Sequence, residues 1–325
     1  ITGILLYLAL TAFDIDILAG QRTLLFLFNT AFLAMLLVWG VEGTSGNKSW
    51  LHFPFLPFNI QPAEVCKITY IIILAKTMSL NRNRISSLRS VGTLTFHMLW
   101  IVALIVVISH DTGVALIFMF LFVVMAYVGG VSGWWFLGGA GAVAAVSPYL
   151  WKYFIRDDQK QRILALIDPS IDPDGLGVLW QTNKSLEALR NGGLTGQGLL
   201  SGEHIFVPNA WNDFIFAYLA NVLGFLGAAA VLLLLFALCL RTLRTGLQCP
   251  DALGCNICVG IFAALFLQCV INIGMNLQVL PVIGVTLPFF SAGGSSVVMM
   301  YLCVGIVLSV GMNPRRSKLE MQQIL

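Results

Sequence analysis

Apolar residues follow one another along this chain in long unbroken runs, which short polar turns separate. A transmembrane helix needs about 20 mostly apolar residues. Nine segments approach that length: 1–19, 23–41, 63–80, 93–109, 113–130, 133–154, 214–240, 254–275 and 293–312. Because these runs are continuous and do not alternate between apolar and polar residues, they predict helices and exclude membrane-spanning strands. The first segment is the weakest span, since Asp14 and Asp16 lie near its end.

The composition supports this interpretation. Hydrophobic residues make up 58% of the chain and charged residues only 10%, and the mean hydropathy is +0.88. A soluble domain carries about 25% charged residues, so the composition indicates an integral membrane protein. The net charge of +3 is too small to indicate a nucleic-acid partner. We therefore predict one all-α, polytopic membrane domain over residues 1–325 with nine visible transmembrane helices.

Basic residues of the short loops predict the orientation in the membrane. When the nine spans alternate, one side receives Arg22, the cluster Arg82, Arg84 and Arg89, the pair Arg241 and Arg244, and the basic tail 313–325. The positive-inside rule makes this side cytoplasmic, so the C-terminus is predicted inside. The odd number of spans and the apolar start at Ile1 predict one missing upstream helix and a ten-span parent.

The opposite, external side receives the longest polar segment, which runs from residue 155 to Asn212 and ends at Asp213. A carboxylate at the mouth of a span is costly unless a cavity or chemistry needs it, although Asp213 could also simply cap the next helix. Within this external loop, 182–190 is predicted to form a short amphipathic helix, and the glycines at 192–198 give flexible backbone suited to a lid. No cofactor is predicted firmly; the acidic group Asp168, Asp172 and Asp174 leaves a divalent cation as an alternative.

Polar residues at the ends of other spans are further candidates. Gln61 and Pro62 begin a helix in which Glu64 and Lys67, three residues apart, share one face and can pair. Either the two charges neutralise each other structurally, or Lys67 faces an anionic ligand. Asp111 lies in the tight turn between two spans, where it either caps the following helix or belongs to a site.

The segment 280–296 combines prolines and glycines and is predicted to be irregular before the last span. Irregular backbone at membrane depth needs cover by protein or access to water, so this segment indicates a cavity wall. Ser291 precedes Gly293, Gly294 and Ser295, whose N–H groups at a helix start would suit an anion. The alternative is a packing corner of small residues.

The seven cysteines predict neither a disulfide framework nor a metal site. None lies in the predicted external loops, and the pair Cys255 and Cys258 has no histidine nearby.

An ordered series of motifs resembles the SEDS membrane proteins (shape, elongation, division and sporulation; the RodA, FtsW and SpoVE type) over essentially the whole chain. The matching residues are Gly46 and Trp50; Gln61-Pro62-Ala63-Glu64 with Lys67; Asp111-Thr112-Gly113; Arg162, Asp168-Pro169, Gln181 and Ser185-Leu186; Gly192-Gly193-Leu194, Gly196 and Gly198; Pro208 and Asp213-Phe214-Ile215-Phe216; Gly224-Phe225-Leu226-Gly227; Asn272, Pro281, Gly284, Leu287-Pro288, Ser291 and Gly293-Gly294-Ser295.

The resemblance implies a ten-span polymerase of bacterial cell-wall glycan in the plasma membrane. Its substrate would be lipid II, a disaccharide-pentapeptide on an undecaprenyl pyrophosphate carrier, and its partner a class B penicillin-binding protein (a transpeptidase). Asp213 would be the general base for the acceptor hydroxyl, and Lys67 and Arg162 would face the pyrophosphate. The remaining substrate-binding candidates are Gln61, Glu64, Asp111, Ser291, Gly293, Gly294 and Ser295.

The chain departs from the family pattern at several polar positions. Ser109-His110 replaces Gln-Pro before Asp111, Ser49 replaces an arginine, and Asn209 and Asn221 stand where acidic residues are expected. Two alternatives to the polymerase therefore stay open: a flippase for the same lipid, and a weakly active scaffold for the transpeptidase. A flippase needs intramembrane charges along a path to the cytoplasmic face, whereas the polar residues of this sequence gather in the predicted external half.

Overall fold

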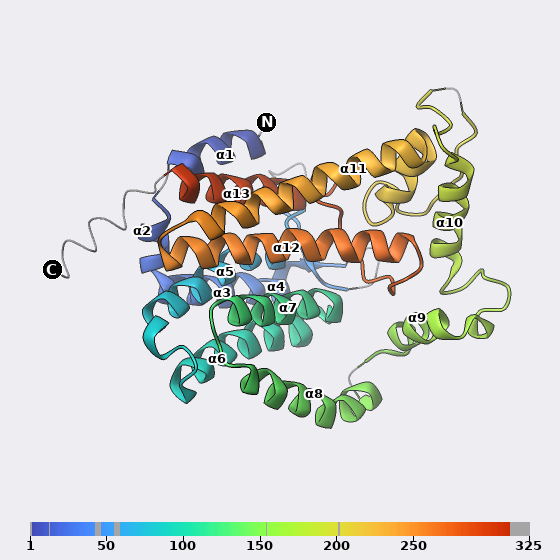
Figure 1. Cartoon of the computed structure of the whole chain (residues 1–325). Helices are drawn as coiled ribbons and strands as arrows, with labels where there is room; N and C mark the ends of the chain where they lie inside the picture. Colours follow the sequence, from blue (N-terminus) through green and yellow to red (C-terminus); the bar gives the residue numbers. More distant parts are fainter. Residues whose placement is uncertain are drawn as a thin grey trace. The chain divides into compact units, whose positions relative to one another are not determined.

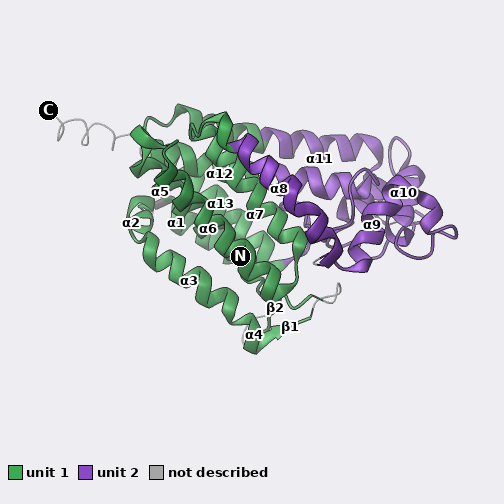
Figure 2. Ribbon diagram, turned by 90° about the horizontal axis from the view of Figure 1, so that it is seen from below, with its two compact units in different colours: residues 1–135, 238–265, 294–325 green, residues 136–237, 266–293 purple. Residues whose placement is uncertain are grey.

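The computed structural model describes residues 2–12, 14–42, 47–54, 59–153, 155–200 and 202–312. The chain divides into two compact units, which Figure 2 colours separately. Unit 1 comprises residues 1–135, 238–265 and 294–325, and unit 2 comprises residues 136–237 and 266–293. Gly46 and the predicted cytoplasmic tail 313–325 lie outside the described residues.

Unit 1 is built mainly of helices (Figure 1). They are α1 (Thr2–Ala12), α2 (Ile15–Gly20), α3 (Arg22–Ala34), α4 (Leu36–Trp39), α5 (Pro62–Leu80), α6 (Leu88–Leu104) with a π-helical extension (Ile105–Ser109), α7 (Thr112–Val128) and α13 (Gly294–Met312), together with the end of α11 (Ile215–Gln248) and the first part of α12 (Ala252–Asn276). A 3-10 turn (Arg82–Arg84) follows α5. A short antiparallel pair, β1 (Gly40–Val41) and β2 (Trp50–Leu51), places Gly40 opposite Leu51.

Close helix packing in unit 1 uses small residues. α1 lies along α13, where Gly3 faces Tyr301 and Gly305 faces the α1 backbone at Tyr7. Gly260, on the last helix before the C-terminal span, faces Ile71 of α5. Small residues let helix backbones approach closely, which is how helices associate within lipid.

Unit 2 contains most of the predicted external loop. Its helices are α8 (Gly133–Tyr153), α9 (Asp157–Ile167), a 3-10 turn (Pro169–Ile171), α10 (Trp180–Gly192), and parts of α11 (Ile215–Gln248) and α12 (Ala252–Asn276). The predicted helix at 182–190 is confirmed as α10, whereas α9 was not predicted. A buried cluster joins Ala188 of α10 to Phe214, Ala217, Met275 and Val282.

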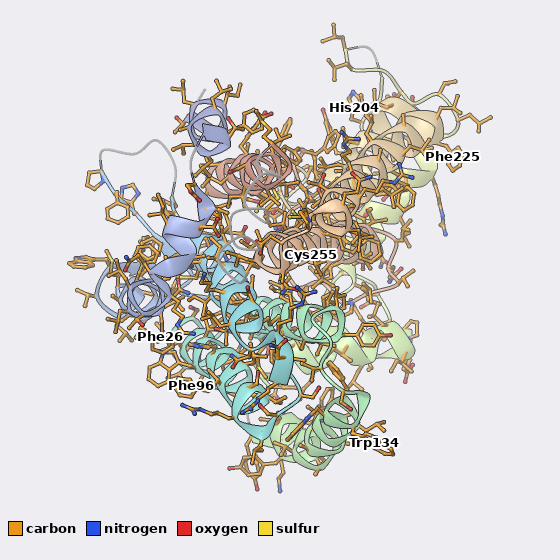
Figure 3. All side chains as sticks on the ribbon, turned by 60° about the vertical axis from the view of Figure 1, so that its left-hand side comes forward. Phe26, Phe96, Trp134, His204, Phe225 and Cys255 are labelled. Atoms are coloured by element: carbon orange, nitrogen blue, oxygen red, sulfur yellow. The ribbon has the colours of Figure 1, made fainter. Side chains whose placement is uncertain are left out.

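Helices lie at all nine predicted spans, and they confirm the helical fold. Among the described residues, five segments are long and apolar enough to cross a membrane: Arg22–Trp39, Leu88–Ser109, Ile215–Gln248, Ala252–Asn276 and Gly294–Met312. α5 is long enough but carries Glu64, Lys67 and Lys76. Large apolar side chains such as Phe96 and Phe225 are exposed, 53% and 65% respectively, as expected for helices in lipid (Figure 3). The count of nine spans stays a prediction.

The first predicted span, 1–19, is not one continuous helix. α1 ends at Ala12, and the Asp14 carboxylate accepts a hydrogen bond from the backbone N–H of Asp16 at 2.9 Å, which caps α2. The same acidic residues that weakened the sequence pattern therefore break the helix.

α11 is broken at Gly224, and the glycine-rich segment 193–198 repairs the break. Gly224 adopts φ 69° and ψ −172°, which frees backbone groups on both sides. Gln197 and Gly198 donate to the carbonyls of Asn221 and Val222 at 3.0 Å each, and Phe225 and Leu226 donate to the carbonyls of Gly193 and Leu194 at 2.8 and 3.1 Å. A Cβ atom at Gly196 or Gly224 would overlap the facing backbone. The glycines predicted as part of a lid thus brace α11 through backbone hydrogen bonds.

Candidate functional site

Asp213 precedes α11 and is half-buried. Its backbone carbonyl accepts hydrogen bonds from two amides of α12, Asn272 Nδ2 at 2.9 Å and Asn276 Nδ2 at 3.0 Å. The two asparagines are four residues apart on one face of the helix, and both are completely buried. The backbone that carries the Asp213 carboxylate is therefore held by side chains of α12.

The same two amides bind further segments of unit 2. Asn272 Nδ2 also donates to the carbonyl of Val285 at 2.7 Å, and Asn276 Oδ1 accepts from the backbone N–H of Ala217 at 3.0 Å. The hydroxyl of Ser185, on α10, donates to the backbone carbonyl of Asn276 at 2.8 Å. These bonds join α10, the start of α11, α12 and the segment after α12.

The segment 277–293 contains no helix or strand, as predicted from its prolines and glycines. Ser291 Oγ donates to the carbonyl of Asn212 at 2.7 Å and accepts from the N–H of Leu287 at 2.8 Å. Gly284 has a φ of 70°, and a Cβ atom there would lie 3.7 Å from Asp213 Oδ2. The irregular segment therefore runs directly beside the Asp213 carboxylate.

Arg162, on α9, reaches the same irregular segment. Its Nη1 donates to the carbonyl of Val282 at 3.0 Å. Unit 2 thus brings three of the predicted residues, Asp213, Arg162 and Ser291, to one irregular stretch of backbone, which Gly293 ends.

Unit 1 holds the predicted charged pair of α5. Lys67 Nζ donates to Glu64 Oε1 at 2.7 Å, and both side chains are buried. Glu64 Oε2 is buried with no hydrogen-bond partner among the described residues. Gln61 is the N-cap residue of α5, but its side chain makes no capping hydrogen bond. The ion pair is confirmed, while a ligand for Lys67 stays a prediction.

Asp111 caps α7, as one of the two predicted alternatives required. Asp111 Oδ1 accepts from the N–H of Val114 at 3.0 Å, and Oδ2 accepts from Ser49 Oγ at 3.3 Å. Burial raises the pKa of Asp111, and these hydrogen bonds oppose that rise. Both carboxylate oxygens are therefore engaged in holding the turn between α6 and α7.

α13 begins at Gly294, as the sequence predicted for the last span. Ser295 is buried, and its Oγ has no hydrogen-bond partner among the described residues. α13 thus starts with a glycine and a small serine. This start is compatible with both predicted alternatives, an anion site and a packing corner of small residues.

Three comparisons with known proteins place the chain in a family. Residues 1–316 match the family model FTSW_RODA_SPOVE, described as "Cell cycle protein". The chain belongs to the FtsW/RodA/SpoVE family. It is a multi-pass membrane protein.

Relatives and solved structures of this family cover most of the chain. Stage V sporulation protein E of Bacillus subtilis (strain 168) is 35% identical over 283 residues, which are 86% of this chain and 75% of that protein. Peptidoglycan glycosyltransferase MrdB of Escherichia coli (strain K12) is 33% identical over 272 residues, 82% of this chain and 71% of that protein.

Two structures are similar over 97% of this chain. One, described as "Structural coordination of polymerization and crosslinking by a peptidoglycan synthase complex", gives a TM-score of 0.80 at 28% identity over 88% of that chain. The other, the rod shape determining protein RodA of Thermus thermophilus, gives 0.69 at 26% identity over 85% of that chain.

The structure gives two of the departures from the FtsW/RodA/SpoVE pattern a local role. Asn221, fully buried, donates from Nδ2 to the carbonyl of Ala188 at 2.9 Å, while its Oδ1 lies 3.2 Å from His204 Nδ1. A carboxylate could not donate to that carbonyl. Asn209 has a φ of 53°, a conformation in which asparagine is enriched, and its carbonyl accepts from the N–H of Phe214. Both asparagines thus stabilise the backbone around α10 and the start of α11.

Two aspartates of the acidic group in the predicted external loop bind nearby residues of the same loop. Asp172 accepts from the N–H groups of Gly177 and Leu179, and Asp168 accepts from Ser170. Among the described residues, no group of three or more His, Cys, Asp or Glu side chains could hold a metal ion. Asp168 and Asp172 therefore stabilise turns, as aspartates before proline commonly do.

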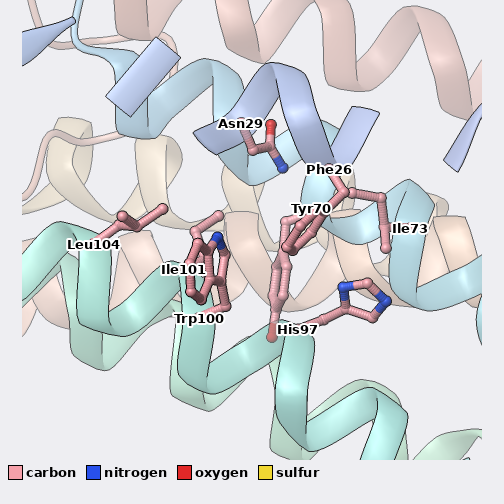
Figure 4. A pocket seen from close by; sticks show the side chains of 8 residues that line it. All are labelled: Phe26, Asn29, Tyr70, Ile73, His97, Trp100, Ile101 and Leu104. Atoms are coloured by element: carbon pink, nitrogen blue, oxygen red, sulfur yellow. The ribbon is translucent and has the colours of Figure 1, made fainter. Parts of the chain in front are cut away.

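A separate small pocket lies between α3, α5 and α6 in unit 1 (Figure 4). Four of its eight lining residues carry rings, and Phe26 lies edge-on to His97 at a centroid distance of 5.3 Å. Its buried polar atoms include Tyr70 Oη and His97 Nδ1, neither of which has a hydrogen-bond partner among the described residues. It contains no carboxylate and none of the predicted site residues.

Sequence reasoning missed the role of Asn272 and Asn276. Asn272 was recognised only as part of a motif, and Asn276 was not singled out. The available signal was two asparagines four residues apart in an apolar helix, since buried amides within lipid must find partners. Their partners lie far away in the sequence and could not be read from this pattern.

Proposed function

We propose that this chain is a peptidoglycan glycosyltransferase that polymerises lipid II at the outer face of the bacterial plasma membrane, in cell elongation, division or sporulation. Family membership supports the reaction class, since relatives are named peptidoglycan glycosyltransferases. The observation that carries the proposal is the Asp213 carboxylate, half-buried at the mouth of an apolar helix and carried on a backbone that two buried amides hold.

In the proposed reaction, the 4-hydroxyl oxygen of the acceptor sugar attacks the anomeric carbon of the donor sugar. The bond from that carbon to the pyrophosphate oxygen breaks, and undecaprenyl pyrophosphate leaves with the bonding electrons. The proton of the acceptor hydroxyl passes to the Asp213 carboxylate. General base catalysis of this kind contributes about 100- to 10,000-fold in rate.

Cationic and N–H groups would stabilise the leaving pyrophosphate. We assign this role to Lys67 and Arg162. The ion pair with Glu64 leaves Lys67 two further donors, and the Arg162 guanidinium has donors beyond the one bound to Val282. The N–H groups at Gly293, Gly294 and Ser295 are further anion donors in the proposal. Ser291, Gln61, Glu64 and Asp111 complete the proposed set of substrate-binding residues.

The proposed orientation follows the basic short loops: the loop 155–213 is external and the C-terminus is cytoplasmic. The proposed partner is a class B penicillin-binding protein, because a structure similar to this chain belongs to a peptidoglycan synthase complex.

The test uses purified full-length chain, with and without a class B transpeptidase, and labelled lipid II. We expect glycan polymer from the wild type, and polymerisation that is about 100- to 10,000-fold slower from Asp213→Ala. In parallel, the same protein in vesicles is assayed for transfer of labelled lipid between leaflets. Lipid transfer without polymer would replace this proposal with the flippase. The absence of both activities would favour the scaffold for the transpeptidase.

A further inference from the structure

The Asn276 amide occupies the place of a helical hydrogen bond. In a regular helix, the N–H of Ala217 would donate to the carbonyl of residue 213, four positions earlier. Here Ala217 N donates to Asn276 Oδ1, and Asn276 Nδ2 donates to the Asp213 carbonyl, at 3.0 Å each. The side-chain amide is thus inserted between the two backbone groups, and it separates Asp213 from the first turn of α11.

Asn272 adds a second bond to the same Asp213 carbonyl and connects it to the irregular segment. Its Nδ2 binds the Asp213 carbonyl and the carbonyl of Val285, next to Gly284 in the segment that runs beside the carboxylate. Asn276 Nδ2 also donates to the carbonyl of Asn272 at 2.7 Å. An amide plane offers donors and an acceptor in fixed directions, and burial makes each lost bond costly.

We propose that Asn272 and Asn276 are positioning residues that set the direction of the Asp213 carboxylate. This inference rests on the proposed function of Asp213 as the general base. Both amides bind Asp213 at its backbone carbonyl, so they act on the carboxylate through its main chain. Because a general base works only within hydrogen-bond reach of the proton it accepts, a shift of this backbone lowers the rate of the chemical step.

The test compares Asn272→Leu and Asn276→Leu with a matched control on the same helix. Gln268 lies one turn before Asn272, is equally buried, and its Oε1 has no hydrogen-bond partner among the described residues. We expect each Asn→Leu variant to lower kcat about 100-fold, as a misplacement of about 1 Å can, with KM little changed. Gln268→Leu is expected to keep a rate close to that of the wild type.

A second readout separates positioning from general damage. In an Asp213→Ala background, where the base is already absent, Asn276→Leu should cause no further loss, because the two residues act as one unit. A multiplicative loss in that background, or equal losses in the control and the Asn variants, would overturn the inference. If the Leu variants fail to fold, Ser185→Ala takes their place, since it removes only the bonds from the Ser185 hydroxyl to Asn276, at 2.8 Å to the backbone carbonyl and at 3.4 Å to Oδ1. A wild-type kcat for folded Ser185→Ala would then overturn it.

Failure of the inference and failure of the proposed function give different results. If Asp213→Ala loses activity while the Asn variants behave like Gln268→Leu, the positioning role is disproved and the proposed base is kept. If Asp213→Ala polymerises as well as the wild type, the proposed base falls, and the positioning role falls with it.

Discussion

The two units hold their functional charges in opposite ways. In unit 1, Glu64 and Lys67 lie three residues apart on one helix and neutralise each other through their own side chains. In unit 2, Asp213 is held through its backbone by asparagines 59 and 63 positions away. One arrangement is local and depends on α5 alone. The other depends on the folding of four segments around α12.

The difference indicates what each region is sensitive to. Removal of one member of a buried ion pair lowers the free energy of unfolding, because the other charge is left uncompensated. A small shift of the irregular backbone that carries a carboxylate lowers the catalytic rate, because it changes the direction of the carboxylate without exposing a charge. Substitutions of the Glu64–Lys67 pair should therefore change the unfolding midpoint as well as the rate, whereas those around Asp213 should change mainly the rate.

The largest stability effect is expected in unit 1. Lys67→Met leaves Glu64 buried without its partner and should destabilise the protein by about 3–5 kcal/mol. Lys76→Met, on the same helix but at a half-buried position, is the matched control. Thermal unfolding in detergent measures both variants. The double variant Glu64→Gln/Lys67→Met should recover much of the loss. A Lys67→Met variant as stable as Lys76→Met would show that the ion pair with Glu64 does not stabilise the protein.

A smaller effect is expected where the glycine segment braces α11. Gly196 has a φ of 83°, and a Cβ there would overlap the Val222 carbonyl. Gly196→Ala should lose about 1–3 kcal/mol from backbone strain alone, and the overlap adds to this loss. Gly193 has a φ of 53° with open space around it, so Gly193→Ala should lose less. Equal unfolding midpoints for the two variants would show that the overlap with α11 is not formed.

The smallest effect is expected at the cap of α7. Asp111→Ala removes the acceptor for the Val114 N–H and should cost about 1 kcal/mol. Asp111→Asn keeps a capping oxygen and should preserve the unfolding midpoint. If Asp111→Asn keeps its stability yet loses polymerisation, Asp111 contacts the substrate as well as the turn.

The comparison of the units also explains what the sequence could predict. Local patterns were sufficient for the pairing of Glu64 with Lys67, for α10, and for the irregular stretch before α13. Each depends on residues within one turn or one short segment. Asp14 and Asp16 marked the first span as the weakest, but the break between α1 and α2 was not predicted.

Long-range backbone contacts could not be predicted from the sequence. The glycines at 193–198 indicated flexibility, whereas their partners are the four backbone groups around Gly224 that a broken helix frees. Likewise, the asparagines of α12 bind backbone carbonyls that no periodicity reveals. A sequence pattern shows that a buried polar group needs a partner, but the fold decides which group supplies it.

The most direct test of Asp213 as the general base is the polymerisation rate of Asp213→Asn. Asparagine keeps the size of the side chain, and the bonds from Asn272 and Asn276 reach only the backbone, so the fold should be preserved. We expect a loss of about 100- to 10,000-fold in rate with an unchanged unfolding midpoint. A folded Asp213→Asn protein that polymerises lipid II at the wild-type rate would contradict it.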